Sequence, residues 1–131
     1  MHIVVVGAGR VGASVAGWLV ASGHEVAVID EHEPTCSALD EALGSISIVG
    51  DGTDVGVLSR AGVNRADILI ATTRRDDVNL AACQLAKHKF GVSKTISVVN
   101  SPDYSDMFVT LGVDVAVDIA EMVLGRVQEG M

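Results

Sequence analysis

Aromatic residues and cysteines are scarce in this sequence. Of its 131 residues, 3% are Phe, Trp or Tyr, and two are Cys. Without aromatic rings the chain lacks the platforms on which proteins stack nucleic-acid bases. Cys36 and Cys83 lie far apart and outside any CxxC spacing. We therefore expect two separate buried thiols, not a disulfide or a metal site.

Positive charge is also scarce. Nine Lys and Arg stand against 17 Asp and Glu, which gives a formal net charge of −8. A phosphate backbone is bound by clustered basic residues, so we expect no nucleic-acid partner. No apolar run approaches the roughly 20 residues of a membrane helix. The first apolar run also ends at glycines too soon for a signal peptide. These absences predict a cytoplasmic chain without direct membrane insertion.

Short apolar runs and helical patterns alternate along the whole chain, whose residues are 49% hydrophobic. The runs expected as strands are 2–6, 25–30, 46–49, 68–72, 95–99 and 114–117. The expected helices are 11–22, 34–43, 54–61, 76–90, 104–111 and 119–131. Strands that alternate with helices over short connections predict an α/β fold with a doubly wound, Rossmann-like parallel sheet and helices on both faces. Residues 1–131 are expected to form a single domain.

The first predicted strand ends in a glycine motif, G-x-G-x-x-G, at Gly7, Gly9 and Gly12. In such a turn the first glycine allows the tight bend and the second lets the backbone approach a pyrophosphate. The third lets the helix pack closely on the strand. The amide groups at the start of the following helix then face the phosphates. The strand before the motif and the helix after it support a nucleotide-binding turn.

An acidic residue, Asp30, ends the second predicted strand, 18 positions after Gly12. A carboxylate at this place accepts hydrogen bonds from the ribose hydroxyls and repels the extra phosphate of NADP. This favours NAD(H) or an adenine nucleotide such as ATP or ADP. The alternative is that Asp30 only caps the turn before the second helix.

The third predicted strand is followed by the segment VGDGTD. Asp51 and Gly52 are candidates for contact with an adenine edge, because ligands of such sheets lie beyond the carboxyl ends of the strands. The alternative is a plain turn in which Thr53 or Asp54 caps the next helix.

The fourth predicted strand is followed by ATTRRDDVNL. Thr72, Thr73 and Arg74 are expected near the phosphate side of the same crevice. The alternative has Asp76 as the N-cap of the fourth helix and the arginines in solvent, an interpretation that suits Arg75 better than Thr73.

Taken in order, GAGRVG, the acid after the second strand, GDGTD, T-x-x-D-x-x-N at 73–79 and VNSPDY at 99–104 resemble a known family. The family is that of Trk/Ktr-type potassium-uptake regulators, whose nucleotide-binding domain is also called RCK or KTN. The resemblance implies a non-enzymatic cytosolic domain that binds NAD(H) or ATP/ADP. It also implies a homo-oligomer, a dimer that builds a larger ring on a membrane potassium transporter or channel subunit, with 119–131 crossing to a neighbouring subunit.

The resemblance also assigns site residues. It implies that the phosphates of the ligand are lined by Gly7, Gly9, Arg10 and Val11. The ribose would be lined by Asp30, the adenine by Asp51 and Gly52, and the distal part of the ligand by Thr73. Three positions depart from the family pattern: Val98 replaces an arginine, Arg75 an aspartate and Asp118 a proline. The small C-terminal ligand-binding domain usual in the family does not follow in this sequence.

Two other functions share these features. The chain could be the cofactor half of an NAD-dependent dehydrogenase, which has the same glycine turn. Against this, none of the four histidines (His2, His24, His32 and His88) stands at the carboxyl end of a predicted strand. It could also be an assembly module whose nucleotide is bound permanently.

Overall fold

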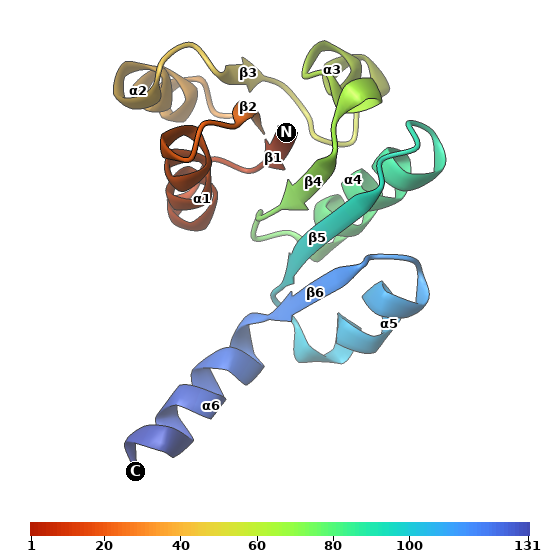
Figure 1. Cartoon of the computed structure of the whole chain (residues 1–131). Helices are drawn as coiled ribbons and strands as arrows, with labels where there is room; N and C mark the ends of the chain where they lie inside the picture. The colour runs from red at the N-terminus through yellow and green to blue at the C-terminus, as the bar shows by residue number, and fades with distance from the viewer.

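The computed structural model describes all 131 residues, and its centre is a six-stranded sheet (Figure 1). All strand pairs are parallel, in the order β3-β2-β1-β4-β5-β6. The strands are β1 (His2–Val6), β2 (Glu25–Asp30), β3 (Ser47–Val49), β4 (Ile68–Ala71), β5 (Lys94–Val99) and β6 (Val115–Asp118). The predicted doubly wound Rossmann-like sheet is confirmed.

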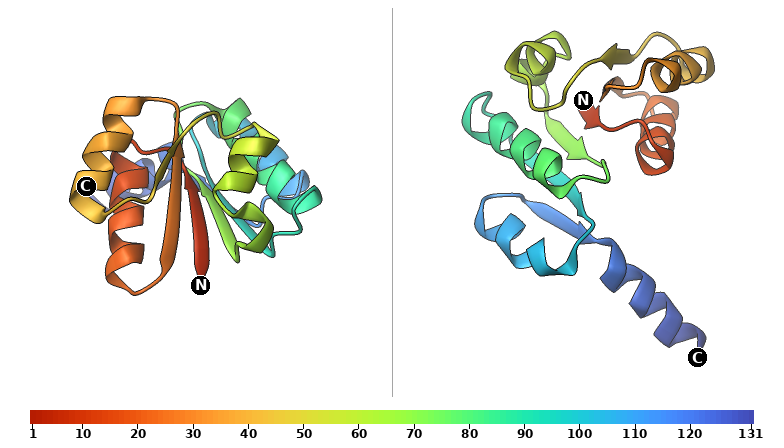
Figure 2. Two further views of the ribbon diagram at one scale, coloured as in Figure 1. Left: turned by 90° about the horizontal axis from the view of Figure 1, so that it is seen from above. Right: turned by 180° about the vertical axis from the view of Figure 1, so that it is seen from behind.

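Helices cover both faces of this sheet (Figure 2), with α1 and α2 on one side and α3, α4 and α5 on the other. They are α1 (Arg10–Ala21), α2 (Glu33–Leu43), α3 (Val55–Arg60), α4 (Asp76–His88), α5 (Ser105–Thr110) and α6 (Ile119–Gly130). Two 3-10 turns, η1 (Val63–Arg65) and η2 (Pro102–Tyr104), were not predicted. Because the apolar pattern fixes each element, the predicted boundaries agree with the structure to within two residues.

The central strand β1 shows how the sequence specifies the layers. All five of its residues are buried, and Val4 and Val6 face the α3–α5 side while Ile3 and Val5 face the α1–α2 side. Successive strand side chains point to opposite faces, so a strand covered by helices on both sides must be apolar throughout. The largely apolar sequence of β1 is therefore consistent with its place at the centre of a parallel, fully covered sheet.

The strand order reverses beside β1. The chain moves outward from β1 to β2 and β3, and then returns to pair β4 with the other edge of β1. The connections on the two sides therefore leave β1 and β4 toward opposite faces, which opens a crevice at their carboxyl ends. This is where the sequence places its glycine turn.

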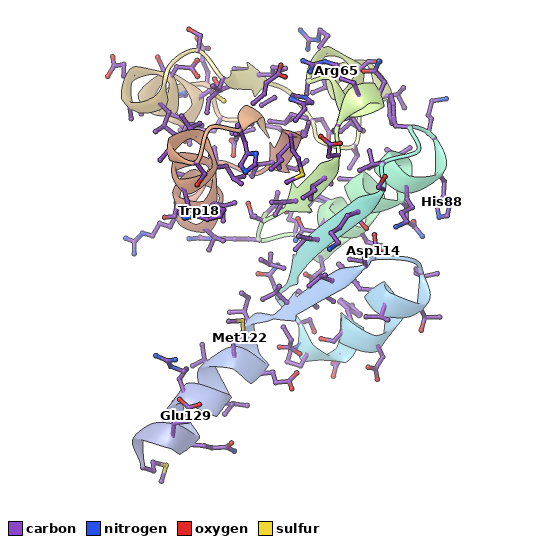
Figure 3. The ribbon with its side chains drawn as sticks, viewed as in Figure 1. Trp18, Arg65, His88, Asp114, Met122 and Glu129 are labelled. Carbon is purple, nitrogen blue, oxygen red and sulfur yellow. The ribbon has the colours of Figure 1, made fainter.

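The last helix, α6, has no buried residue. It projects from the body of the domain in Figure 1, and Figure 3 shows Met122 and Glu129 on it away from the rest of the fold. Met122, Val123 and Val127 are 59%, 57% and 50% exposed. None of the helices, α6 included, combines the length and the hydrophobicity that crossing a membrane requires.

Candidate functional site

A cavity of about 480 Å³ lies at the carboxyl ends of β1 and β2, bounded by the loops after β3 and β4. Its volume falls within the range of small-molecule sites. Of the predicted site residues, it is lined by Gly7, Asp30, Asp51, Gly52, Thr73 and Arg74. The others, Gly9, Arg10, Val11, Gly12 and Thr72, are not part of its lining. Four separate strand ends thus converge on one space, as the sequence predicts.

The three glycines of the turn occupy different environments. Gly7 has a φ of +106°, a conformation that side chains rarely adopt, and a Cβ there would lie 2.8 Å from Thr72 Oγ1. A Cβ on Gly12 would lie 1.8 Å from the carbonyl oxygen of Gly7. A Cβ on Gly9 would meet no atom within 4 Å. Gly7 and Gly12 are therefore needed by the fold itself, whereas Gly9 faces open space.

The N-terminus of α1, directly after the glycine turn, has no side-chain cap. Gly9 is the N-cap residue and supplies no side-chain hydrogen bond, and the first turn of α1 has no acidic residue. Arg10 and Val11 are exposed, and Arg10 forms no ion pair. The first amide groups of a helix have no intrahelical partner and carry a partial positive charge. This arrangement suits an anionic group.

Thr72 supports the turn from beneath. Its Oγ1 lies 3.1 Å from the carbonyl oxygens of both Val6 and Gly7, to which it can donate a hydrogen bond. The hydroxyl therefore ties the end of β4 to the glycine turn. Thr72 holds the shape of the site and does not face the cavity.

Asp30 connects two turns through its carboxylate. Its Oδ2 accepts a hydrogen bond from the Ala8 amide at 2.8 Å, and its Oδ1 accepts one from the His32 amide at 2.8 Å. The cap of α2 is His32, whose ring accepts from the Thr35 amide. A carboxylate has about four lone-pair sites, so Asp30 retains acceptor capacity for a ligand hydroxyl at the cavity wall.

Asp51 is held in a tight turn by Thr53. Its Oδ1 accepts from the Thr53 amide at 2.8 Å and from the Thr53 hydroxyl at 2.7 Å. These two hydrogen bonds, with a weaker attraction from Arg75, hold the pKa of the Asp51 carboxyl below its usual range. The cap of α3 is Asp54, which accepts from the Val57 amide. Because Asp54 caps α3 and Asp51 does not, the cap leaves Asp51 in the cavity wall, and the proposed adenine contact does not compete with it.

The loop after β4 is clamped by Asn79, which is fully buried. Asn79 Oδ1 accepts from the amide and the hydroxyl of Thr73, at 3.0 and 2.6 Å. Its Nδ2 donates to the carbonyl oxygens of Thr73 at 3.0 Å and Val98 at 3.3 Å. With its amide fully used, Asn79 positions Thr73 and has no group left for a ligand.

The suggestion that Asp76 caps α4 is wrong. Arg75 is the N-cap residue and has no side-chain cap bond. Asp76 is the first residue of the helix, and its carboxylate turns toward the end of β5, where it accepts from the amides of Asn100 and Ser101. The carboxylate thus binds the loop that follows β5 and does not cap its own helix.

Sequence reasoning missed part of the cavity wall. Arg75 forms a bidentate ion pair with Asp77, at 2.6 Å and 3.2 Å, and both line the cavity. The other lining residues that were not predicted are Val6, Ile29, Glu31, Gly50, Thr53, Val78 and Ala81. The spacing of Val78 and Ala81 by three places them on one side of a helix. That spacing was the available clue.

The TrkA-N domain model matches residues 3–119. The chain belongs to the TrkA-N domain family. This TrkA-N domain is 35% identical over 114 residues to the "Trk system potassium uptake protein TrkA homolog" of Methanothermobacter thermautotrophicus. The match covers 87% of this chain and 52% of the relative, so the chain spans about half the length of that protein.

Solved structures share the fold. The TrkA-N domain of the inner membrane protein ybaL from Escherichia coli superposes with a TM-score of 0.91 at 22% identity, covering 99% of this chain and 96% of that one. GsuK bound to ADP superposes with a TM-score of 0.82 at 26% identity, covering 98% of this chain and 34% of GsuK. The GsuK channel bound to NAD superposes with a TM-score of 0.81 at 22% identity, covering 92% of this chain and 22% of that one. This TrkA-N domain therefore has the architecture of an RCK domain.

Proposed function

We propose that this TrkA-N domain is a cytosolic regulatory domain of a potassium transport system and that it binds NAD(H) or ATP/ADP. The observation that carries the proposal is the cavity at the reversal of strand order, where an open glycine turn and an acidic strand end meet. The family and its potassium-uptake relatives supply the transport context.

The residues present fit an adenine nucleotide. The uncapped start of α1 beside Gly9 would hold the phosphates, with Arg10 and Val11 on the first turn. Asp30 would accept from the ribose hydroxyls. The adenine would lie against the apolar side chains of Ile29, Val78 and Ala81, which line the cavity. Adenine, ribose and pyrophosphate are common to NAD(H), ATP and ADP.

The charge of the cavity wall bears on which nucleotide is preferred. Four carboxylates line the cavity, namely Asp30, Glu31, Asp51 and Asp77, against two arginines. Like charges at short range disfavour each other. A 2′-phosphate near Asp30 and Glu31 would be repelled, so we expect NADPH to bind more weakly than NADH.

We further propose that α6 reaches a neighbouring subunit in a homo-oligomer. An isolated helix of 12 residues is marginal in water, yet α6 buries none of its residues against its own domain. Packing of Met122, Val123 and Val127 on a second copy would supply the missing burial. Dimers built in this way would join into a ring beneath a membrane potassium transporter or channel subunit, at the inner face of the membrane.

Regulation then follows from differential affinity. A nucleotide shifts a ring between two shapes only by the difference between its binding free energies to the two. Moving a gate from mostly closed to mostly open takes about 5.5 kcal/mol. Several equal sites in one ring can share this amount, so each needs only a modest preference.

The alternative is the cofactor half of an NAD-dependent dehydrogenase, which shares the glycine turn. The TrkA-N family match and the potassium-uptake relatives favour the regulatory function over it.

The experiment is a thermal-shift titration of nucleotide-stripped protein with NAD⁺, NADH, NADPH, ATP, ADP and AMP. A ligand at about 100 times its Kd adds about 2.7 kcal/mol, which raises the Tm of a domain of this size by several degrees. We expect a shift with NADH or the adenine nucleotides and a smaller one with NADPH. No shift with any of them would overturn the sensor function in favour of an assembly module.

A further inference from the structure

A second polar cluster lies behind the cavity wall, between the start of α4 and the end of β5. It consists of Thr73, Asp76, Asn79, Asn100 and Ser101, and we call it the Asp76 junction. Only Thr73 of the five lines the cavity. The other four come from α4 and from the loop that follows β5. The junction therefore joins the binding site to a part of the chain that the ligand would not touch.

Asp76 binds the β5 loop at three points. Its Oδ1 accepts from the backbone amide of Asn100 at 2.8 Å and from the side-chain amide of Asn100 at 3.0 Å. Its Oδ2 accepts from the Ser101 amide at 2.9 Å. Hydrogen bonds to a charged acceptor are stronger than those between neutral groups. The start of α4 and the start of η2 are therefore held as one unit.

The same unit holds the edge of the cavity. The carbonyl oxygen of Thr73 accepts from the side-chain amides of both Asn79 and Asn100, each at 3.0 Å. Asn79 is fully buried, whereas Asn100 is exposed. A movement of Thr73 would therefore shift Asn100, which is bonded to its carbonyl oxygen. Through Asp76, it would also shift Ser101.

From Ser101 the connection continues to α6. Ser101 is the N-cap residue of η2, and η2 and β6 make the main contacts of α6 with the body of the domain. Directly after η2, the Ser105 hydroxyl donates to Asp118 Oδ2 at 2.7 Å. Asp118 Oδ1 in turn accepts from the Glu121 amide at 3.0 Å and caps α6. The segment from Ser101 to Ser105 is thus bound at one end to the start of α4 and at the other end to the start of α6.

We propose that Asp76 and Asn100 are positioning residues that join the edge of the nucleotide cavity, at Thr73, to the base of α6. This inference rests on the proposed function, since it concerns how occupancy of that cavity is regulated and reported. Ligand binding at Thr73 and the placement of α6 are then linked, and the linkage works in both directions.

The test is amide hydrogen exchange of the 131-residue chain with and without saturating ADP. In the wild type, ADP should slow exchange in the glycine turn (7–12), in the loop at 73–79, in the segment 100–104 and in the first turn of α6 (119–122). In Asn100→Ala, the slowing at 7–12 should remain and the slowing at 119–122 should be lost. Because Asn100 is exposed, this variant should fold.

Two further variants sharpen the test. Ser105→Ala interrupts the connection later, so it should keep the slowing at 100–104 and lose it at 119–122. Asn64→Ala is the matched control, because Asn64 is also exposed and lies in η1, between α3 and β4 at the opposite end of the sheet. It should behave as the wild type.

The outcomes separate this inference from the proposed function. Slowing at 7–12 with none at 119–122 in the wild type would overturn the inference and leave nucleotide binding intact. Undiminished slowing at 119–122 in both Asn100→Ala and Ser105→Ala would also overturn it. No slowing anywhere with ADP, NAD⁺ or AMP would overturn the proposed function, and this inference with it.

Discussion

The two ends of the sheet carry charged groups in different ways. At the amino ends of the strands, two ion pairs join charged groups to one another. Arg65 binds Glu25 bidentately, with a shortest distance of 2.6 Å, and Lys87 binds Asp114. His2 Nε2 lies 2.9 Å from the carbonyl oxygen of Ala61. Arg65 and Asp114 are labelled in Figure 3.

At the carboxyl ends, several groups face open space. Arg10, Arg74 and Glu31 form no ion pair, and the start of α1 has no cap. The same parallel sheet thus has one end closed by its own side chains and one end left open around a cavity. The difference shows that charged groups at one end are used up in ion pairs of the fold, whereas groups at the other end, such as Asp30, retain hydrogen-bonding capacity for a ligand.

The largest expected effect on stability comes from a substitution in the glycine turn at the open end of the sheet. Gly12→Ala should lower the free energy of unfolding by about 3 kcal/mol, because its Cβ would lie 1.8 Å from the Gly7 carbonyl oxygen. Urea denaturation measures it. Gly17→Ala, on the same helix, is the control and should not destabilise, because its Cβ would lie 3.9 Å from Leu43 Cδ2, an ordinary van der Waals contact. Equal stability of both variants would mean that the turn is not tightly packed.

Gly9→Val should abolish nucleotide binding without unfolding the domain. A Cβ on Gly9 would meet no protein atom within 4 Å, so the side chain would fill only the open space in which we propose that the phosphates bind. We expect a loss of affinity of at least about 100-fold, roughly 2.7 kcal/mol, by calorimetric titration. Gly125→Val, whose Cβ also meets open space but lies on α6, is the matched control. Retained affinity in Gly9→Val would remove the phosphates from this turn.

Asp30→Ala should weaken binding of NADH or ADP by about 2 kcal/mol, the scale of a lost hydrogen bond to a charged group. It should also lower stability slightly, because the amides of Ala8 and His32 lose their acceptor. Comparing NADH with NADPH separates the two roles. If Asp30 faces the ribose, the variant binds the two dinucleotides more equally. An unchanged Kd would restrict Asp30 to joining the two turns.

At the closed end of the sheet, we expect a substitution to change how stability depends on pH and to leave nucleotide affinity unchanged. The Lys87 ammonium and the Thr95 amide hold the pKa of the Asp114 carboxyl below its usual range. Asp114 therefore stabilises the fold above its unfolded pKa of about 3.9, and this contribution is lost as the pH falls through the lower folded value.

Asp114→Asn should accordingly cost about 1 kcal/mol at pH 7. The difference from wild type should vanish in strong acid, and nucleotide affinity should not change. Thermal unfolding across pH 2–7 measures the first effect. A change in Kd would show that the two ends of the sheet are not independent.

The open end was predictable wherever function and fold need the same local pattern. The glycine turn and Asp30 follow one contiguous strand–turn–helix–strand unit, so their spacing alone reveals them. The residues Asp51, Gly52, Thr73 and Arg74 could be placed because the carboxyl ends of parallel strands meet at one edge. The Arg75–Asp77 pair and Glu31 were missed, since exposed charges have no periodicity to read.

What the sequence by itself determined is the order of the elements and the layer to which each side chain belongs. The spacing of apolar residues and the positions of glycines determine both, because these signals act between residues that are close together in the sequence. Only the tertiary structure decided how polar groups are used, because their partners lie far away along the chain. Asp76 reads as a helix cap and instead binds Asn100 and Ser101, 24 and 25 residues further on. Met122 is an apolar residue that the sequence alone would place in a core, but the fold leaves it 59% exposed, because α6 buries no residue against its own domain.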